Sequence, residues 1–297
     1  MRNAVFIHTN PKQIVGALVA QHALVRNSAA PERFDVRILQ TPDFPAFERF
    51  EGRRYLREGK QTVWRNDDLQ SFTPLRFAVP EQMGYAGRAV ITDPDVFALG
   101  DVNELLDRDM QGAAVMARQM SDEFRRSLHY ASSVMLLDCS RLEHWKWEAD
   151  FEMLFRGERD YRDWMWLLLE PAGSVGVLES QWNDFDRLES DTKMLHNTHR
   201  RTQPWKTGLP SDFTPRGTTL KSRAGIWLRR FTGRGAGHYR QHPDPAQERL
   251  FFQLLGECLD NGSVSVSMLK DEIAHGHIRT DALECIARSR PASRLAA

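Results

Sequence analysis

Short apolar runs and a helical periodicity follow one another at the start of the chain. Residues 4–7 form an apolar run and residues 34–39 alternate in polarity, so each segment predicts a β-strand. Between them Ile14, Leu18 and Val25 recur near one face of a predicted helix, with Val15 and Val19 beside it. A strand, a helix and a second strand in this order predict a parallel βαβ unit, the beginning of an α/β fold.

The apolar run of residues 89–91 leads to two carboxylates, Asp93 and Asp95. The run is too short and too β-branched for a helix, so it predicts a buried strand that ends at Pro94, which has no N–H to donate. The two acids then lie at the carboxyl end of a strand, where open α/β sheets bind ligands. Two hard oxygen donors suit Mn²⁺ or Mg²⁺ held together with substrate phosphates. Taken alone, the pattern also describes a solvated turn.

The rest of the pattern predicts further strands and helices separated by turn residues. Arg76 lies in one predicted helix, where it is either a solvated charge or a bidentate partner of a carboxylate or phosphate. Asp163 stands at the start of another, and residues 41–66 predict loops and short helices over the sheet edge. The predicted strands are 112–117, 133–138 and 175–178, and the predicted helices are 67–80, 102–106, 164–169, 245–259 and 270–288.

Composition narrows the function classes. The 297 residues carry 40 basic and 40 acidic side chains, so no overall field recruits nucleic acid. No run approaches the ~18 apolar residues of a membrane span, and the apolar part of the N-terminus is too short for a secretory leader. The three cysteines are far apart and show no metal-ligand spacing, which predicts free thiols in a reducing compartment: Cys139, Cys258 and Cys285.

Three polar stretches carry further candidate chemistry. The loop after the first strand holds Thr9 and Asn10, which are able to read a nucleotide, although it has no Gly-x-Gly-x-x-Gly or P-loop pattern. Residues 194–208 supply histidines, arginines, a lysine and an indole, a set that suits a metal-bridged anion or an ordinary basic loop. Residues 213–243 contain no acid and several arginines, which suits an anionic membrane surface, a phosphorylated acceptor or a solvated linker.

Together these segments resemble the family-8 retaining glycosyltransferases, enzymes of the GT-A fold. The likeness covers roughly residues 4–208 and includes an Asp-x-Asp after an apolar strand, a Gly-Asp shortly after it, and a late His followed by Pro-Trp. The resemblance implies a GT-A-type (Rossmann-like) mixed sheet flanked by helices in residues 1–210. Residues 211–297 would add the basic segment and a small helical C-terminal extension. The matching motifs are Arg76 to Pro80, Arg88 to Asp101, Ser132 to Leu136, Trp182-Asn183, His196 and Pro204 to Lys206.

The resemblance also implies a hexosyltransferase that takes a UDP-sugar as its nucleotide-sugar donor, holds it through Mn²⁺ (or Mg²⁺), and transfers the sugar to a hydroxyl acceptor. Asp93 would touch the ribose and the metal, and Asp95 would ligate the metal. His196 would be the third protein ligand, with His199 as a competitor. The implied catalytic residues are Asp163, which would position the sugar, and Arg76. The implied donor-binding residues are His8, Thr9, Asn10, Arg76, Arg88, Asp93 and Lys206.

Two departures from the family pattern support an alternative function. The family's Asn-Ser-Gly is Ala131-Ser132-Ser133 here, and its Asp-Gln-Asp element is reduced to Asp163. A catalytically weak nucleotide-sugar-binding or partner-docking protein is therefore the alternative to the transferase. The expected location is the cytoplasm, with peripheral contact at the inner membrane face through residues 213–243 as a further expectation.

Overall fold

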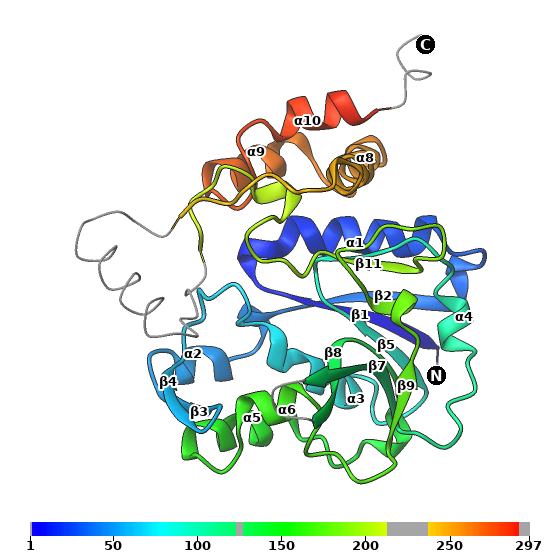
Figure 1. Ribbon diagram of the computed structural model, residues 1–297, viewed down its shortest axis with the longest axis vertical. Helices are drawn as coiled ribbons and strands as arrows, with labels where there is room; N and C mark the ends of the chain where they lie inside the picture. Colours follow the sequence, from blue (N-terminus) through cyan, green and yellow to red (C-terminus); the bar gives the residue numbers. More distant parts are fainter. Residues whose placement is uncertain (1, 123–126, 213–236, 291–297) are drawn as a thin grey trace. The chain divides into compact units, whose positions relative to one another are not determined.

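The computed structural model describes residues 2–122, 127–212 and 237–290 (Figure 1). The chain divides into two compact units, residues 1–196 and 197–297, which are described separately below. The boundary after residue 210 that the resemblance implies stays a prediction.

The first unit is built on a six-stranded mixed sheet, which confirms the expected α/β fold. Strand β1 pairs in parallel with both β2 and β5, whereas β8 runs antiparallel to β5 and β7. The predicted strands are present, although the one expected at residue 112 begins only at residue 115. The sheet order is β2 (Phe34–Gln40), β1 (Asn3–Thr9), β5 (Arg88–Thr92), β8 (Ser127–Asp138), β7 (Val115–Asp122) and β9 (Val175–Leu178).

The central strands are apolar at successive positions because helices cover both faces of the sheet. On one face Phe6, Ile91 and Leu137 join a large core that includes aromatic side chains of α5 (Trp147–Arg156) and α6 (Tyr161–Met165). On the other side of the sheet lies α1 (Ile14–Arg26), in contact with β1 (Figure 1).

Helix α1 forms where the sequence predicts it, and its buried face is centred on the side of Val15 and Val19. The helix buries Val15 and Val19 together with small residues, while Val25 is 45% exposed. The reason is close packing: a Cβ added to Gly16 would lie 2.6 Å from the carbonyl oxygen of Pro94. A face of glycine and alanine lets the helix approach the turn after β5, and a count of large apolar side chains does not reveal such a face.

Two other segments differ from their predicted form, and a third agrees with it. Residues 41–66 contain a short helix, α2 (Ala46–Phe50), and an unpredicted hairpin of β3 (Arg54–Arg57) and β4 (Lys60–Val63). The helix predicted at residues 67–80 is a 3₁₀ turn, η4 (Thr73–Ala78), followed by α3 (Val79–Gln82). The short helix expected after the Asp-Pro-Asp turn is present as α4 (Asn103–Leu106).

The helical run predicted at residues 164–169 ends early for a backbone reason. Helix α6 stops at Met165, and Leu167 adopts a left-handed conformation with φ of 56°. The amide of Leu168 then donates to the carbonyl of Asp163 at 3.0 Å, which closes the helix in the manner of a Schellman cap. Helix length here is set by the cap and not by the apolar pattern.

A second, three-stranded sheet completes the first unit. Strand β6 (Val96–Ala98) continues directly from the Asp-Pro-Asp turn and pairs antiparallel with β11 (Met194–His196), which pairs in parallel with β10 (Asp184–Phe185). A short 3₁₀ turn, η6 (Ser180–Asn183), leads into β10. Segments about a hundred positions apart in the chain are thereby joined, although the sequence predicts only a loop around residue 194.

The second unit is helical. The helix predicted at 245–259 is α8 (Pro245–Asp260), and the side chain of Asp244 caps it by accepting from the amide of Ala246. The helix predicted at 270–288 is two helices, α9 (Val266–Ala274) and α10 (Ala282–Ser289). A 3₁₀ turn, η7 (Pro204–Lys206), places Trp205 in a stacked contact with Phe251.

Three further expectations concern the basic segment, membrane-spanning helices and the cysteines. Most of the basic segment 213–243 lies outside the described residues, so membrane contact through it stays a prediction. Among the described residues no helix is long and apolar enough to cross a membrane. The three cysteines are buried free thiols, as predicted, and burial raises the pKa of Cys139 to about 12.

Candidate metal and donor site

The Asp-Pro-Asp turn forms at the carboxyl end of β5, as the sequence predicts. The amide of Asp93 donates to the carbonyl of Ser133 on β8 at 3.0 Å, and the amide of Val96 donates back to the carbonyl of Asp93. These bonds make a tight turn in which Asp93 and Asp95 are 6% and 9% exposed. The turn is part of the protein interior, which excludes the solvated-turn alternative.

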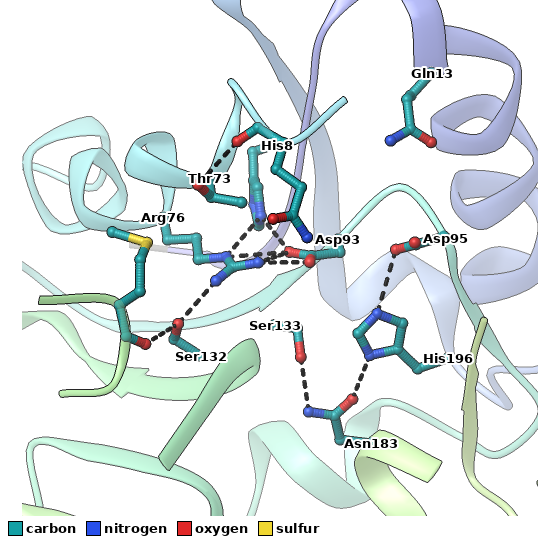
Figure 2. A network of polar contacts seen from close by, with 12 residues as sticks. His8, Gln13, Thr73, Arg76, Asp93, Asp95, Ser132, Ser133, Asn183 and His196 are labelled. Atoms are coloured by element: carbon teal, nitrogen blue, oxygen red, sulfur yellow. Dashed lines mark hydrogen bonds and ion pairs between the residues drawn. The ribbon is translucent and has the colours of Figure 1, made fainter. Parts of the chain in front are cut away.

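The carboxylate of Asp93 is held by two neighbours (Figure 2). The guanidinium of Arg76 donates from Nη2 to Oδ2 at 2.5 Å and to Oδ1 at 2.7 Å. His8 Nε2 lies 2.6 Å from Oδ1. Burial opposes ionisation of Asp93, yet the Arg76 charge and the His8 contact hold the pKa of its carboxyl below the usual range. Asp93 is therefore an ionised carboxylate in a dry environment.

At His8 the balance between burial and neighbouring charges is the reverse of that at Asp93. Burial lowers the pKa of this imidazole, and that effect exceeds the opposing influence of Asp93. Neutral His8 donates to the carboxylate through Nε2 when the ring proton is on that atom. Arg76 is thus the cation that balances Asp93, while His8 contributes a hydrogen bond.

His196 reaches the acidic turn through the small three-stranded sheet. It is the last residue of β11 and lies opposite Val96, the residue that follows Asp95. Its Nε2 is 3.4 Å from Oδ1 of Asp95. Burial opposes protonation of His196, but the nearby carboxylates of Asp95 and Asp93 raise the pKa of the imidazole overall. Pairing of β6 with β11 is what makes these distant residues neighbours.

Asp93, Asp95 and His196 form a cluster able to hold a metal ion. Each offers one ligand atom, and the three atoms lie within 4.8 Å of one another. Two carboxylate oxygens and an imidazole nitrogen are donors that Mn²⁺ accepts, and three protein ligands leave coordination positions for phosphate oxygens. The predicted ligand set is therefore brought together, although its role as a ligand set stays a prediction.

Two buried hydrogen-bond chains support this cluster (Figure 2). Arg76 Nη1 donates to the hydroxyl of Ser132 at 2.8 Å, and that hydroxyl donates to the carbonyl of Met165. Asn183 contacts both His196 and Ser133. Sequence reasoning assigned no role to Asn183 or the two serines; their motifs were visible, but hydrogen-bond direction cannot be read from a sequence pattern.

The loop after β1 is buried and anchored. Thr9 donates to the carbonyl of Asn10, and the Asn10 carboxamide donates to the Ser71 hydroxyl at 3.0 Å. Gln13 donates to the carbonyl of Leu69 at 3.2 Å. These carboxamide N–H groups hold residues 68–71 in place. Whether Thr9 and Asn10 also touch a nucleotide stays a prediction.

Two other predicted residues are engaged elsewhere in the first unit. Arg88 is the first residue of β5, at the end of the strand opposite Asp93, and donates to the carbonyls of Leu106 and Arg108. The carboxylate of Asp163 accepts from Arg162 at 2.8 Å and its side chain is 32% exposed. Neither residue belongs to the hydrogen-bonded group around Asp93.

His199 and Lys206 lie in the second unit and are described within it. His199 is exposed, and its ring nitrogen Nδ1 lies 3.1 Å from the hydroxyl of Thr202. Lys206 is fully buried, donates to Asp212 at 2.5 Å and faces the ring of Tyr239. Of the two candidate histidines, His196 is the one in the three-residue cluster.

Comparison with known proteins gives similarity of structure and none of sequence. No family model and no curated protein matches the chain. Among solved structures it is similar to the glycosyltransferase GlyE of Streptococcus pneumoniae TIGR4, with a TM-score of 0.49, 13% identity, and coverage of 88% of this chain and 64% of GlyE. The chain thus spans less than two thirds of GlyE.

Two other solved structures are named as glycosyltransferases. Galactosyltransferase LgtC in complex with donor and acceptor sugar analogues gives a TM-score of 0.47 and 12% identity over 79% of this chain and 96% of LgtC. Mouse xyloside xylosyltransferase 1 gives 0.43 and 16% over 67% of this chain and 98% of that protein. Likeness at this level assigns no activity to the chain.

Proposed function

We propose that this protein is a metal-dependent retaining glycosyltransferase similar to family 8, which moves a hexose from a UDP-sugar to a hydroxyl on a glycan, lipid-linked or protein acceptor. The observation that carries the proposal is the buried cluster of Asp93, Asp95 and His196 at the carboxyl end of β5. Such a position and donor set suit a divalent ion, Mn²⁺ or Mg²⁺, bound together with a diphosphate.

In this proposal Asp93, Asp95 and His196 would hold the ion, whose chemistry when bound would be neutralisation of the negative charge on a departing nucleoside diphosphate. Arg76 and His8 keep Asp93 ionised and fix the direction of its carboxylate. Burial of the acids strengthens every charge interaction at this point, because little water is present to screen it.

The direction from which the acceptor approaches follows from the retaining chemistry that the resemblance implies. The acceptor hydroxyl enters on the same face from which the diphosphate leaves, and the diphosphate takes the proton. Asp163 is proposed to position the donor sugar rather than to form a covalent bond with it. Thr9, Asn10 and Lys206 are proposed to contact the donor.

The first test is calorimetric titration of UDP into the protein with Mn²⁺ present, and again with a chelator. We expect binding that requires the metal and is lost in Asp95→Ala. Arg88→Ala, at the opposite end of β5, is the matched control and should retain binding. Folded Asp93→Ala and Asp95→Ala variants that transfer sugar at the wild-type rate would contradict the proposal.

A catalytically weak nucleotide-sugar-binding or partner-docking protein is the second candidate. It is favoured by Asp163, whose carboxylate is paired with the adjacent Arg162, and by Ala131, which lacks a side-chain amide. Turnover of a panel of UDP-sugars separates the two candidates. Metal-dependent donor binding without transfer or donor hydrolysis would favour the binding protein.

A further inference from the structure

The side chain of Asn183 is fully buried and uses both ends of its carboxamide (Figure 2). Its Oδ1 lies 2.8 Å from Nδ1 of His196. Its Nδ2 donates to the hydroxyl of Ser133 at 3.0 Å. Asn183 thus connects the ring on β11 to strand β8, next to the acidic turn.

The orientation of the Asn183 carboxamide favours one of the two neutral tautomers of His196. With Nδ2 of Asn183 facing Ser133, the acceptor Oδ1 faces His196, so Nδ1–H is the tautomer in which the neutral ring donates to Asn183. Nε2 of the neutral ring then keeps its lone pair, and Nε2 is the atom that lies 3.4 Å from Asp95. A histidine that binds a metal through Nε2 needs this tautomer.

Ser133 links this arrangement to the acids. Its hydroxyl accepts a hydrogen bond from the Asn183 carboxamide, and its main-chain carbonyl accepts one from the amide of Asp93 at 3.0 Å. The adjacent Ser132 holds Arg76, which holds Asp93. Two consecutive residues of β8 therefore anchor both the acidic side and the imidazole side of the cluster.

We propose that Asn183 and Ser133 are positioning residues that keep His196 in the Nδ1–H tautomer and direct Nε2 toward the metal position; the metal's part in this inference rests on the function proposed above. Asn183, in the Trp182-Asn183 motif, thereby acquires a role through His196 rather than by contact with substrate.

The metal test uses the whole 297-residue chain and Mn²⁺ alone, with free Mn²⁺ measured by electron paramagnetic resonance. Asn183→Ala should weaken Mn²⁺ binding by about 10- to 100-fold, the usual effect of removing the partner of a ligating histidine. Asn183→Asp keeps an acceptor for Nδ1–H. It should therefore bind Mn²⁺ about as tightly as the wild type, and more tightly than Asn183→Ala. Ser133→Gly, which removes only the orienting hydroxyl, should cause a smaller loss than Asn183→Ala.

Asn103→Ala is the matched control. Asn103 is also a buried asparagine whose carboxamide is bonded, but it lies on α4 and holds Asp101 and the carbonyl of Ala30. It should lose stability in urea unfolding without losing Mn²⁺ affinity. Equal losses of Mn²⁺ affinity in Asn103→Ala and Asn183→Ala would show a general structural effect and overturn the inference.

A second readout needs no metal. Nitrogen-15 NMR of the imidazole, at a pH where His196 is neutral, should show a protonated Nδ1 in the wild type and in Asn183→Asp, and a shift toward protonated Nε2 in Asn183→Ala. A wild-type Nδ1–H signal retained in Asn183→Ala overturns the inference. If the wild type binds no divalent ion, the proposed function fails, while this spectrum still decides the role of Asn183.

Discussion

At the carboxyl end of β5, the buried Asp93 accepts from Arg76 and His8 and lies beside Asp95 and His196. At the amino end of the same strand, the half-buried Arg88 donates to two main-chain carbonyls, those of Leu106 and Arg108. Both ends belong to one motif in the sequence and both were expected to contact the donor. The difference teaches that a strand separates the residues at its two ends, so the carboxylate cluster and Arg88 are held by different neighbours, and contact between Arg88 and the donor stays a prediction.

The largest effect is expected from removing the charge that balances Asp93. Arg76→Ala leaves a buried carboxylate without its cation, which should lower the free energy of unfolding by about 3–5 kcal/mol. Urea unfolding monitored by tryptophan fluorescence measures the loss. Arg76→Lys keeps a charge but not the bidentate geometry and should fall between the two proteins. A fully stable Arg76→Ala would show that His8 alone holds Asp93.

A smaller effect is expected where α1 touches the Asp-Pro-Asp turn. Gly16→Ala adds a methyl group 2.6 Å from the Pro94 carbonyl oxygen, so helix and turn must move apart. Strain of about 1–3 kcal/mol is expected, partly offset by better helix propensity, together with weaker Mn²⁺ binding. Gly256→Ala, also inside a helix but in the second unit, is the control and should leave Mn²⁺ binding unchanged. Unchanged Mn²⁺ affinity in Gly16→Ala would show that the turn tolerates the displacement.

The pH dependence of metal binding should locate His196 in the cluster. Its pKa lies above the ordinary 6.5, because Asp95 and Asp93 outweigh the opposing effect of burial. Metal binding needs the neutral ring, so Mn²⁺ affinity should fall as the pH drops through the raised pKa, by up to about tenfold per pH unit. In the metal-free protein the sign is opposite: the raised pKa stabilises the fold below pH 6.5, and this contribution is lost as the pH rises through the folded-state pKa. A His196→Gln protein with the same pH profile of metal binding would exclude His196 as the ligand.

The smallest effect on the cluster is expected at the other end of β5. Arg88→Ala removes hydrogen bonds to the carbonyls of Leu106 and Arg108 and should reduce stability modestly. Mn²⁺ and UDP binding should match the wild type. A marked loss of UDP binding in a folded Arg88→Ala protein would restore Arg88 as a donor-binding residue and break the comparison between the two ends.

Local patterns predicted most of the secondary structure but not its boundaries. The strands at β1, β2 and β5 and helix α8 were visible because alternation and periodicity report which side chains leave water. The end of α6 was missed because it depends on Leu167 adopting a left-handed conformation that its residue type does not announce. The centre of the buried face of α1 was not visible, because Gly16 and its small neighbours pack closely despite having little side chain to count.

The candidate site likewise has features that the sequence predicted and features that it did not. Asp93 and Asp95 were placed correctly at the end of β5, since a short β-branched run followed by proline specifies where a strand stops. The nearness of His196 to Asp95 was supplied beforehand only by resemblance to a family, because it depends on pairing between β6 and β11. The engagement of Arg88 and Asp163 away from the cluster was not foreseen at all.

Properties confined to a few consecutive residues were therefore readable from the chain: burial, strand or helix preference, and the chemical nature of the candidate ligands. Properties that depend on which distant segments pair, and in which register, required the folded molecule. The carboxamide of Asn183 illustrates the reason. Its residue type permits a bond in either direction, and only the folded chain places it between Ser133 and His196.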